Sequence, residues 1–481
     1  AEAKAAADLE HDVPGKAPLE AAVGFPTAIV DYTVHQRLGG NAALAILRSR
    51  LRDRGIRLIL DFVPNHMAAD HSWTITNSDY LVKGSLDDLQ REPQNYFSVG
   101  EGNAAIFAHG RDPYYDGWED TVQLNYACPS LRNEMCAILA RVATMCDGVR
   151  CDMAMLQCPS VFQQTWAAHL EPQGIKCADL ASEENLFWPH AITAARAVNK
   201  EFLLIGEVYW GREYDLQEYG FDYTIDKVAF EQLQEIRGDD MRKHLEKDSF
   251  SFLQRCAHYL ESHEEKRASE IFGDTHDEAG TWRHVAAAVV AYTLPGMRLF
   301  NDGQLQGRRK QIPLFLAWRD NSEIRDSKIS AMYSRLMTSV LSRPEVRAGE
   351  WAQCITGASM DNNPSWMNII SHVMWDKFGN CLLVVVNYNF EYANGHVTLP
   401  KGVLVGSRCY PLPNCHDYSG ATPSVQPLPE PESDNERKLL MRDQLSTESF
   451  EREAAVLRGK HGGVWFDLKP WQAHVFELSY V

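Results

Sequence analysis

The stretch IRLILDFVPNH, residues 56–66, places a short apolar run directly before a cluster of polar residues. A helical pattern over residues 42–54 precedes it, and Gly55 separates the two. The same order of helix and then strand recurs in two later parts of the chain. These are residues 131–145 followed by 148–152, and residues 189–198 followed by 202–206. Mostly apolar strands that alternate with helices predict a parallel sheet covered by helices.

Three further extended segments follow, at residues 220–225, 257–261 and 297–300, with helical stretches between them. Six such strands favour a barrel over a doubly wound sheet, although the pattern alone leaves both open. Residues 67–125 are rich in Asp, Asn, Gly, Tyr and Trp, and are too long for a simple connection. They predict a small inserted subdomain.

The character of the chain changes after about residue 350. Alternating runs, including residues 381–388 and 464–478, then replace the helices. Together with a loop rich in Pro, Gly and acidic residues at 411–436, they predict an antiparallel β domain. We therefore expect a catalytic unit over residues 1–350 and a C-terminal unit over residues 351–481.

The overall charge restricts the partners of the protein. The 481 residues include 47 basic and 65 acidic side chains, for a net charge of −18. This acidity disfavours nucleic acid and anionic membranes, and does not disfavour a neutral sugar. The longest apolar stretch, near residues 285–294, is too short to span a bilayer.

The eleven cysteines are scattered and form neither a C-x-x-C pair nor a cluster with histidine. They are typical of reduced thiols, and the first nineteen residues lack the apolar core of a signal peptide. Both features predict a cytoplasmic protein. No feature of the sequence predicts an oligomeric state.

Acidic residues follow four of the apolar strands, namely Asp61, Asp152, Glu207 and Glu261. In a barrel these strand ends converge on one mouth, where barrel enzymes hold their catalytic groups. A single acid at a strand end is equally well explained as a structural cap. Four of them, two with a histidine nearby and one with an arginine two residues earlier, favour a catalytic site.

The chemistry expected of two of these acids differs. Arg150 and Asp152 point to the same side of a strand, so the guanidinium favours an ionised Asp152, as a nucleophile requires. Glu207 follows an apolar run, and partial burial there would raise its pKa toward that of a general acid. Such a pair, about 5 Å apart, performs retaining glycoside hydrolysis.

Four segments, DFVPNH, GVRCD, GEVYW and ESHEEKR, resemble the four signature regions of the α-amylase superfamily in the same order. The resemblance covers the chain from about Gly24 to its end. It implies a (β/α)8 barrel of the TIM type, an inserted subdomain after the third strand and a C-terminal β-sandwich. FNDGQ, from Phe300, resembles the turn after the eighth strand.

The resemblance also assigns roles to individual residues. Asp152 is implied to be the nucleophile and Glu207 the general acid and base, with Glu264 as the third acid. The residues implied to bind substrate are Asp61, His66, Arg150 and His263. Asn65 matches a frequent ligand of a structural calcium ion, and no other cofactor is required. The implied substrate is an α-glucan or a maltooligosaccharide.

Two substitutions depart from the family pattern. Glu264 stands where the family has Asp, and its extra methylene would move the carboxylate enough to cost on the order of a hundredfold in rate unless the backbone accommodates it. Thr27 stands where the family has a tyrosine that stacks on the sugar, whereas Tyr32 is expected to be structural.

The first expected strand matches the third barrel strand of the family, and only 55 residues precede it. A βαβ unit needs about 30 residues or more, and residues 1–23 show no such pattern. We therefore expect an N-terminally incomplete barrel, as in a truncated sequence.

These features leave two readings of the function. The first is a retaining glycosidase of α-linked glucosides, with water or a second sugar as acceptor. The alternative is a catalytically impaired member that binds glucan or serves as a protein-interaction module. A barrel enzyme outside carbohydrate chemistry would need phosphate-binding glycines, and Gly303 and Gly307 alone do not provide them.

Overall fold

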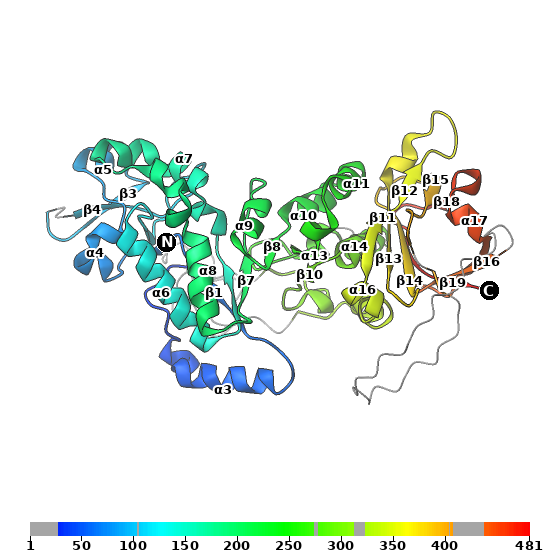
Figure 1. Cartoon of the computed structure of the whole chain (residues 1–481), viewed down its shortest axis with the longest axis horizontal. Coiled ribbons are helices and arrows are strands. Elements are labelled where there is room, and N and C mark those ends of the chain that lie inside the picture. Colours follow the sequence, from blue (N-terminus) through cyan, green and yellow to red (C-terminus); the bar gives the residue numbers. More distant parts are fainter. Residues whose placement is uncertain (1–26, 103–104, 274–277, 312–322, 404, 407–436) are drawn as a thin grey trace. The chain divides into compact units, whose positions relative to one another are not determined.

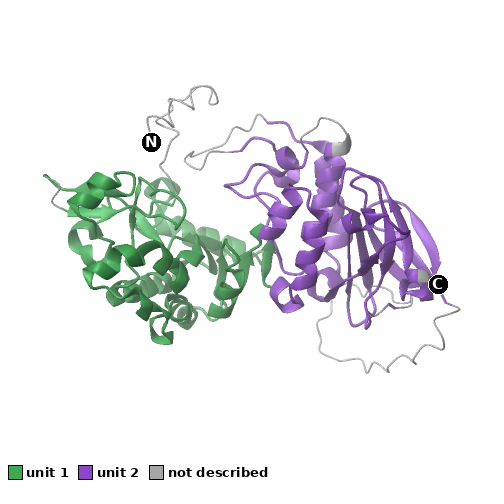
Figure 2. Cartoon of the chain, turned by 90° about the horizontal axis from the view of Figure 1, so that it is seen from above, with its two compact units in different colours: residues 1–227, 255–257, 312–322 green, residues 228–254, 258–311, 323–481 purple. Residues whose placement is uncertain are grey.

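The computed structural model describes residues 27–102, 105–273, 278–311, 323–403, 405–406 and 437–481. The chain forms two compact units, which are described separately below (Figure 2). The first comprises residues up to 227 together with 255–257 and 312–322, and the second comprises the remainder. The expectations for residues 1–23 and 411–436 lie outside the described ranges. The expected division at residue 350 stays a prediction.

The first unit is built on five neighbouring strands of a six-stranded sheet, which run parallel in the order β1-β6-β7-β8-β9. Its strands are β1 (Ile59–Phe62), β6 (Gly148–Cys151), β7 (Leu203–Gly206), β8 (Tyr223–Ile225) and β9 (Cys256–His258). β1 is an edge strand with β6 as its neighbour, so the sheet is not closed into a barrel within the described residues. The parallel sheet that the sequence predicts is confirmed.

Two helices of this unit show why the sequence folds as it does. In α6 (Pro129–Met145) the buried residues recur at helical spacing, and α8 (Phe187–Val198) buries a similar stripe. The two helices pack against each other (Figure 1). α6 begins with Pro129 in its first turn, where the missing N–H costs nothing.

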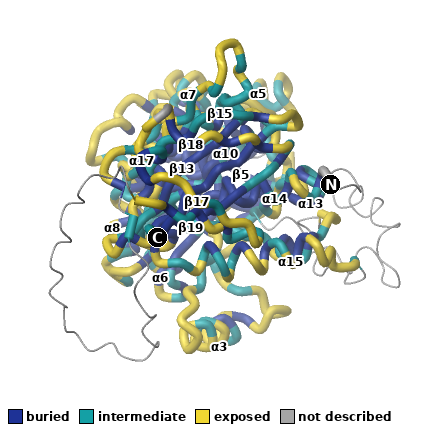
Figure 3. The backbone as a smooth tube through the Cα atoms, turned by 90° about the vertical axis from the view of Figure 1, so that its right-hand side faces the viewer, coloured by how far each residue is buried: buried dark blue, intermediate teal, exposed yellow. Residues whose placement is uncertain are grey.

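Helix α3 (Gly40–Arg52) is largely exposed (Figure 3). Arg48 attaches it to the end of α6, because its Nη2 lies 2.7 Å from Asp147 Oδ1. The other oxygen of Asp147 accepts the N–H of Leu58 at 2.9 Å, just before β1. One carboxylate thus joins a helix and a strand that lie 89 or more residues away in the sequence.

Residues 66–123 contain two antiparallel pairs and several short helices. β2 (His66–Ala68) pairs with β5 (Thr121–Gln123), and β3 (Tyr96–Val99) pairs with β4 (Ala105–Ala108). The helices are α4 (Trp73–Thr76), η2 (Ser78–Tyr80) and α5 (Leu86–Arg91). Further connections are η3 (Ala154–Gln157), α7 (Pro159–Leu170), η4 (Glu171–Gln173), η5 (Cys177–Ala181), η6 (Glu183–Asn185) and α9 (Glu213–Tyr219).

The second unit contains two antiparallel sheets. One has the order β11-β13-β14-β19-β16-β17 and the other β12-β15-β18. Their strands are β11 (Glu350–Gln353), β12 (Ile355–Gly357), β13 (Ile369–Trp375), β14 (Cys381–Asn387), β15 (Ala393–Thr398), β16 (Lys438–Asp443), β17 (Ser449–Glu453), β18 (Val464–Leu468) and β19 (Ala473–Tyr480). Apolar residues of both sheets share one core. The antiparallel β domain expected after residue 350 is therefore present, as two sheets packed against each other.

The remaining helices of this unit lie mainly before the sheets in the sequence. The α-helices are α10 (Lys227–Gln234), α11 (Gly238–Lys247), α12 (Phe250–Leu253), α13 (Ala268–Ile271), α14 (Glu278–Thr293), α15 (Ser327–Leu336), α16 (Pro344–Ala348) and, among the strands, α17 (Ala454–Leu457), with the short strand β10 (Met297–Arg298) after α14. Shorter helical segments are η7 (Gln304–Gln306), η8 (Met337–Leu341), η9 (Pro364–Asn368) and η10 (Lys460–Gly462). Every residue of β14 is buried because α14 packs against that strand. The segment 381–388 is therefore covered on both faces and does not alternate.

Two further expectations concern the chain as a whole. Within the described ranges, no helix is both long and apolar enough to cross a bilayer. Nine cysteines lie in those ranges, and each is a free thiol. The cytoplasmic location stays a prediction.

Candidate active site

Asp152 and Glu207 stand one residue beyond the ends of two neighbouring parallel strands. Cys151 of β6 and Gly206 of β7 are register partners, which brings the two acids to the same end of the sheet. Backbone hydrogen bonds continue past the strands, from Asp152 N to Phe62 O at 2.9 Å and from Glu207 N to Cys151 O at 3.0 Å. Both acids are therefore fixed at the backbone, and both residues are almost fully buried.

A glycine permits the close approach of these two strands. A Cβ atom on Gly148 would lie 2.6 Å from Leu203 O on β7. Any side chain there would push the strands apart, and with them the acids at their far ends. Gly148 is thus required by packing and not by chemistry.

Arg150 links the two acids. Its Nη1 lies 2.8 Å from Asp152 Oδ1, and its Nη2 lies 2.8 Å from Glu207 Oε2. The sequence predicted that Arg150 and Asp152 share a face, and the contact shows that they do. It did not predict the contact with Glu207. The planar fork of arginine suits a position between two carboxylates.

Glu207 has two more partners, which the sequence analysis missed. Met153 N donates to Oε2 at 2.8 Å, and Tyr209 Oη donates to Oε1 at 2.7 Å. Met153 reaches this position because its φ is +44°, a left-handed conformation that non-glycine residues rarely adopt. The spacing of Tyr209, two residues after Glu207, was a signal for the second contact.

Of the four acids that the sequence places at strand ends, Asp61 has the least structural support for a role in the site. Strand β1 begins at Ile59 and not at Ile56, because Gly55 turns with φ +69° and Ile56 is half exposed. Asp61 therefore lies inside the strand and not after it. Its side chain is 62% exposed, and its Oδ1 lies 3.6 Å from Arg150 Nη1. An ion pair this exposed contributes little.

His66 is buried in β2 against the ring of Trp118, with 5.1 Å between ring centroids. Burial lowers the pKa of His66 to about 4, and a Thr27 backbone group opposes this shift only in part. The imidazole is therefore neutral near pH 7. A neutral imidazole offers both a donor and an acceptor to a sugar hydroxyl.

The surroundings of Asn65 bear on whether this residue could be a calcium ligand. Its Oδ1 accepts from Gln123 Nε2 at 3.1 Å, and its Nδ2 donates to Gln123 Oε1 at 3.3 Å. Gln157 Nε2 lies 3.5 Å from the same Oδ1. Calcium prefers about six to eight oxygen ligands that include carboxylates. Within the described residues, the cluster of three acidic or histidine side chains close enough to share an ion is Asp443, Glu448 and His474, which does not include a neighbour of Asn65. The described residues thus offer Asn65 no such cluster, and we assign no chemistry to a metal.

Thr27 and Tyr32 lie near the start of the described chain. Thr27 is half-buried, at the position where the resembling family has a stacking tyrosine. Tyr32 Oη donates to Val63 O and accepts from Val63 N, each at 3.0 Å. This pair of bonds fastens the start of the described chain to the segment after β1, which is a structural role.

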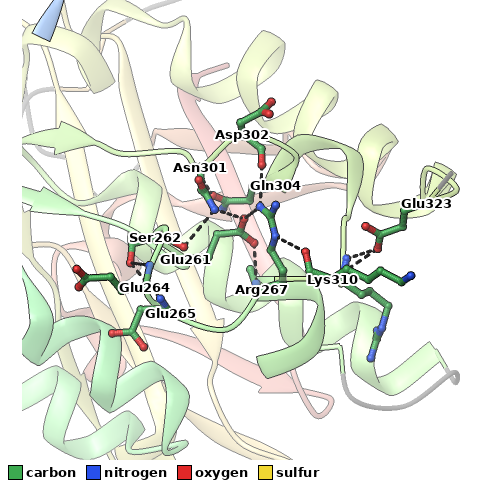
Figure 4. A network of polar contacts seen from close by, with 12 residues as sticks. Glu261, Ser262, Glu264, Glu265, Arg267, Asn301, Asp302, Gln304, Lys310 and Glu323 are labelled. Atoms are coloured by element: carbon green, nitrogen blue, oxygen red, sulfur yellow. Dashed lines mark hydrogen bonds and ion pairs between the residues drawn. The ribbon is translucent and has the colours of Figure 1, made fainter. Parts of the chain in front are cut away.

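The segment of the fourth motif lies in the second unit, and its polar contacts are drawn in Figure 4. Glu261 is the most buried residue of the segment. Arg267 Nη1 donates to Glu261 Oε1 at 2.6 Å, and Ala268 N donates to Oε2 at 2.7 Å. Asn301 Nδ2 donates to Oε1 at 3.2 Å. Burial raises the pKa of Glu261, and these contacts oppose the rise. Because Glu261 accepts hydrogen bonds from three different residues, it organises the loop. The sequence analysis gave Arg267 no role.

His263 and Glu264 are more accessible than Glu261. Their side chains are 42% and 39% exposed, and His263 Nε2 lies 3.4 Å from Glu264 Oε1. The N–H groups of Glu264 and Glu265 both contact Ser262 Oγ, which shapes the turn (Figure 4). Both motif side chains are therefore oriented by a loop that Glu261 and Arg267 anchor.

The catalytic-domain model of the alpha-amylase family matches residues 26–371 of the 481. The chain belongs to the alpha-amylase family. The family that the four segments predict is thereby confirmed. The sheet end that carries Asp152, Glu207 and Arg150 lies inside the matched range.

Individual members of the alpha-amylase family are similar at low identity. Alpha-amylase MalA of Haloarcula japonica is 24% identical over 320 residues, which are 63% of this chain and 39% of that protein. Alpha-amylase 3 of Dictyoglomus thermophilum is 21% identical over 297 residues, which are 59% of this chain and 53% of that protein. The chain thus spans about two fifths to one half of the length of these curated relatives.

A solved structure extends the likeness to the fold. The alpha-amylase from Geobacillus thermoleovorans, complexed with acarbose, matches with a TM-score of 0.60 at 17% identity. The match covers 97% of this chain and 86% of that one. It shows the fold of an alpha-amylase, a barrel-type catalytic domain with a C-terminal β domain.

Proposed function

We propose that this member of the alpha-amylase family is a retaining glycosidase that acts on α-glucans or maltooligosaccharides. The observation that carries the proposal is the bridge that Arg150 makes between two buried carboxylates. A retaining enzyme needs one carboxylate as nucleophile and one carboxyl as proton donor, held close together. We assign these roles to Asp152 and Glu207.

In the first step Asp152 attacks the anomeric carbon while Glu207 donates a proton to the glycosidic oxygen. The bond between that carbon and the leaving sugar breaks, and a glycosyl ester on Asp152 forms. In the second step Glu207 removes a proton from water or from a sugar hydroxyl, which displaces Asp152 with net retention. Transfer to a second sugar is therefore part of the same proposal.

The recognition of the sugar falls to neighbouring groups. We assign His66, which is neutral and buried, to a hydroxyl of the sugar that is cleaved. We assign to His263 and Glu264 the roles in substrate binding and catalysis that the fourth motif implies for them. An exposed aromatic pair supports a sugar substrate, since Tyr114 and Trp210 are 59% and 40% exposed and their ring centroids lie 4.9 Å apart. Aromatic faces of this kind pack against the apolar face of a sugar.

Release of glucose or maltose from maltooligosaccharides tests the proposal. We expect release by the purified chain, with the product first appearing as the α-anomer. Asp152→Asn and Glu207→Gln should each abolish release, whereas Asp215→Asn, an acid of α9 with a 38% exposed side chain, should not. A folded wild-type chain that binds maltooligosaccharides without releasing sugar would favour the binding alternative.

A further inference from the structure

We propose that the outward face of the sheet β12-β15-β18 is a second binding site for α-glucan, with Trp465 as its aromatic platform. The choice of ligand rests on the proposed function, while the site itself lies wholly within the second unit. The site follows from the side chains that the three strands direct away from their core.

Buried and accessible residues alternate along β15 and β18, as expected for strands with one face on a core. The outward residues are Asn394, His396 and Thr398 of β15 and Trp465 and Asp467 of β18. Trp465 lies opposite His396, and Asp467 lies opposite Asn394. Since the strands lie side by side, these residues form two cross-strand pairs on one surface (Figure 1).

Trp465 provides an accessible apolar surface. It is 53% exposed, although tryptophan is highly buried on average in folded proteins. On the other side of its partner His396, β12 contributes Gly357, and a Cβ atom there would meet nothing within 4 Å. Because glycine has no side chain, the row across the three strands stays open next to His396.

Two polar side chains beside the tryptophan are held in fixed orientations. His396 Nδ1 lies 3.1 Å from Gly463 O, and because a carbonyl only accepts, Nδ1 carries a proton. In the neutral ring Nε2 is then the acceptor. Asn394 Oδ1 accepts from Ser359 Oγ and, at 2.9 Å, from Asn363 Nδ2, so Nδ2 is the donor end of the amide. The face thus combines an aromatic ring with an oriented acceptor and an oriented donor.

The charge of this face restricts its ligand. Asp467 is acidic and exposed, and none of the three strands contains Lys or Arg. Nucleic acid, phosphate and anionic lipid are therefore disfavoured. A sugar is neutral, its C–H face packs on an aromatic ring, and its hydroxyl groups both donate and accept hydrogen bonds.

A protein partner fits this face less well than a sugar. Specific interfaces bury about 800 Å² per partner around a core that is depleted of charged residues. The large apolar side chains that the three strands direct outward are Trp465 and Ile355, with polar residues of β15 between them. Asp467 lies two positions from Trp465. A single ring among polar groups matches the amphipathic surface of a sugar.

NMR of tryptophan indole N–H groups tests this site without interference from binding elsewhere. Nitrogen-15-labelled Asp152→Asn chain, which should leave the sugar intact, is titrated with maltoheptaose, and Trp465→Tyr assigns the signal. We expect a saturable shift of the Trp465 signal. Trp282 is the internal control, because it lies on α14 of the same unit and is 54% exposed, and its signal should not move. An unmoved Trp465 signal overturns the proposal.

Affinity electrophoresis in gels that contain amylopectin measures the contribution of the ring. In the Asp152→Asn background, Trp465→Ala should weaken retention by roughly three- to tenfold, as for one lost aromatic contact. Trp465→Tyr keeps a ring and should retain most of the binding, and Trp282→Ala should match the parent. The short substrate maltotriose should show the same kcat and KM in Trp465→Ala as in wild type. Should Trp465→Ala fail to fold, the titration of the intact chain decides.

Neither binding measurement depends on turnover, so the two proposals can fail separately. A chain that releases no sugar but whose Trp465 signal shifts overturns the proposed function and supports the second site. A chain that releases sugar while the Trp465 signal stays fixed overturns the second site alone. Equal retention of Trp465→Ala and its parent, together with a dimer that Trp465→Ala abolishes, overturns the glucan site and assigns the face to a second copy of the chain.

Discussion

Arg150 Nη2 lies 2.8 Å from Glu207 Oε2, so the arginine that the sequence pairs with Asp152 is equally a partner of the second carboxylate. A lysine at this position is a single point charge and cannot hold two carboxylates in a fixed geometry. We expect Arg150→Lys to lower kcat on maltooligosaccharides by on the order of a hundredfold, as for a displacement of catalytic groups by about 1 Å.

Steady-state kinetics on maltooligosaccharides measures this effect. Arg212→Lys is the control, because Arg212 lies just after the Glu207 segment and pairs with the half-exposed Asp215 at 3.0 Å. Equal activity of Arg150→Lys and Arg212→Lys would show that the bridge is not required.

The buried ion pair between Arg267 and Glu261 gives a prediction about stability. Their side chains are 4% and 0% exposed, and removal of one partner leaves the other charge buried. We expect Arg267→Met to lower the free energy of unfolding by about 3–5 kcal/mol. Urea denaturation measures the change.

Lys266→Met is the matched control for this pair, since the neighbouring Lys266 has a side chain that is 67% exposed and pairs with Glu270 on the surface. It should change the free energy of unfolding by less than about 1 kcal/mol. A similar small loss in Arg267→Met would mean that the pair contributes little to the fold.

Buried histidines predict that acid destabilises the second unit. Burial lowers the pKa of His284 to about 4 and that of His372 to about 3. Between these values and the ordinary pKa near 6.5, the unfolded chain binds protons that the folded chain does not. The free energy of unfolding should therefore fall as the pH is lowered from 6.5 toward 4. Glu261, whose pKa burial raises, acts in the opposite direction.

Urea denaturation at pH 7.5 and at pH 5 would measure this dependence. His284→Gln should reduce it, because the variant cannot take up the proton, while the amide can still contact Tyr333 Oη, which lies 2.9 Å from His284 Nε2. A His284→Gln variant with the same pH dependence as the wild-type chain would contradict the burial of His284 in its neutral form.

The surroundings of Asn65 lead to a prediction about whether calcium contributes to stability. The described side-chain partners of this residue are the amides of Gln123 and Gln157 and the imidazole of His66. We expect chelator treatment to leave the Tm unchanged, and added calcium to leave it unchanged as well. A chelator-dependent fall in Tm that calcium reverses would restore Asn65 as a metal ligand.

The sequence predicted much of the architecture near the site. Strand β7 begins one residue later than expected, and α6 starts two residues earlier. The shared face of Arg150 and Asp152 followed from strand geometry alone. Periodicity was sufficient here because these segments are regular and their side chains have only two directions to point.

Other parts of the site could not be predicted from periodicity. The contact from Met153 depends on a left-handed backbone conformation, for which methionine gives no signal. The burial of Glu261 depends on Arg267, six residues later across a loop. Strand β1 was misplaced because Ile56 is apolar yet half exposed, and apolar character alone does not tell which side of a turn a residue occupies.

Trapping of the glycosyl–enzyme intermediate tests the central claim most directly. A fluorinated α-glucosyl fluoride forms the ester quickly and releases it slowly, so intact-mass spectrometry and peptide mapping can locate the sugar. We predict one glucosyl group on Asp152 in the wild-type chain and none in Asp152→Asn. A folded chain that carries no sugar, or carries it on another residue, would contradict the assignment of Asp152 as nucleophile.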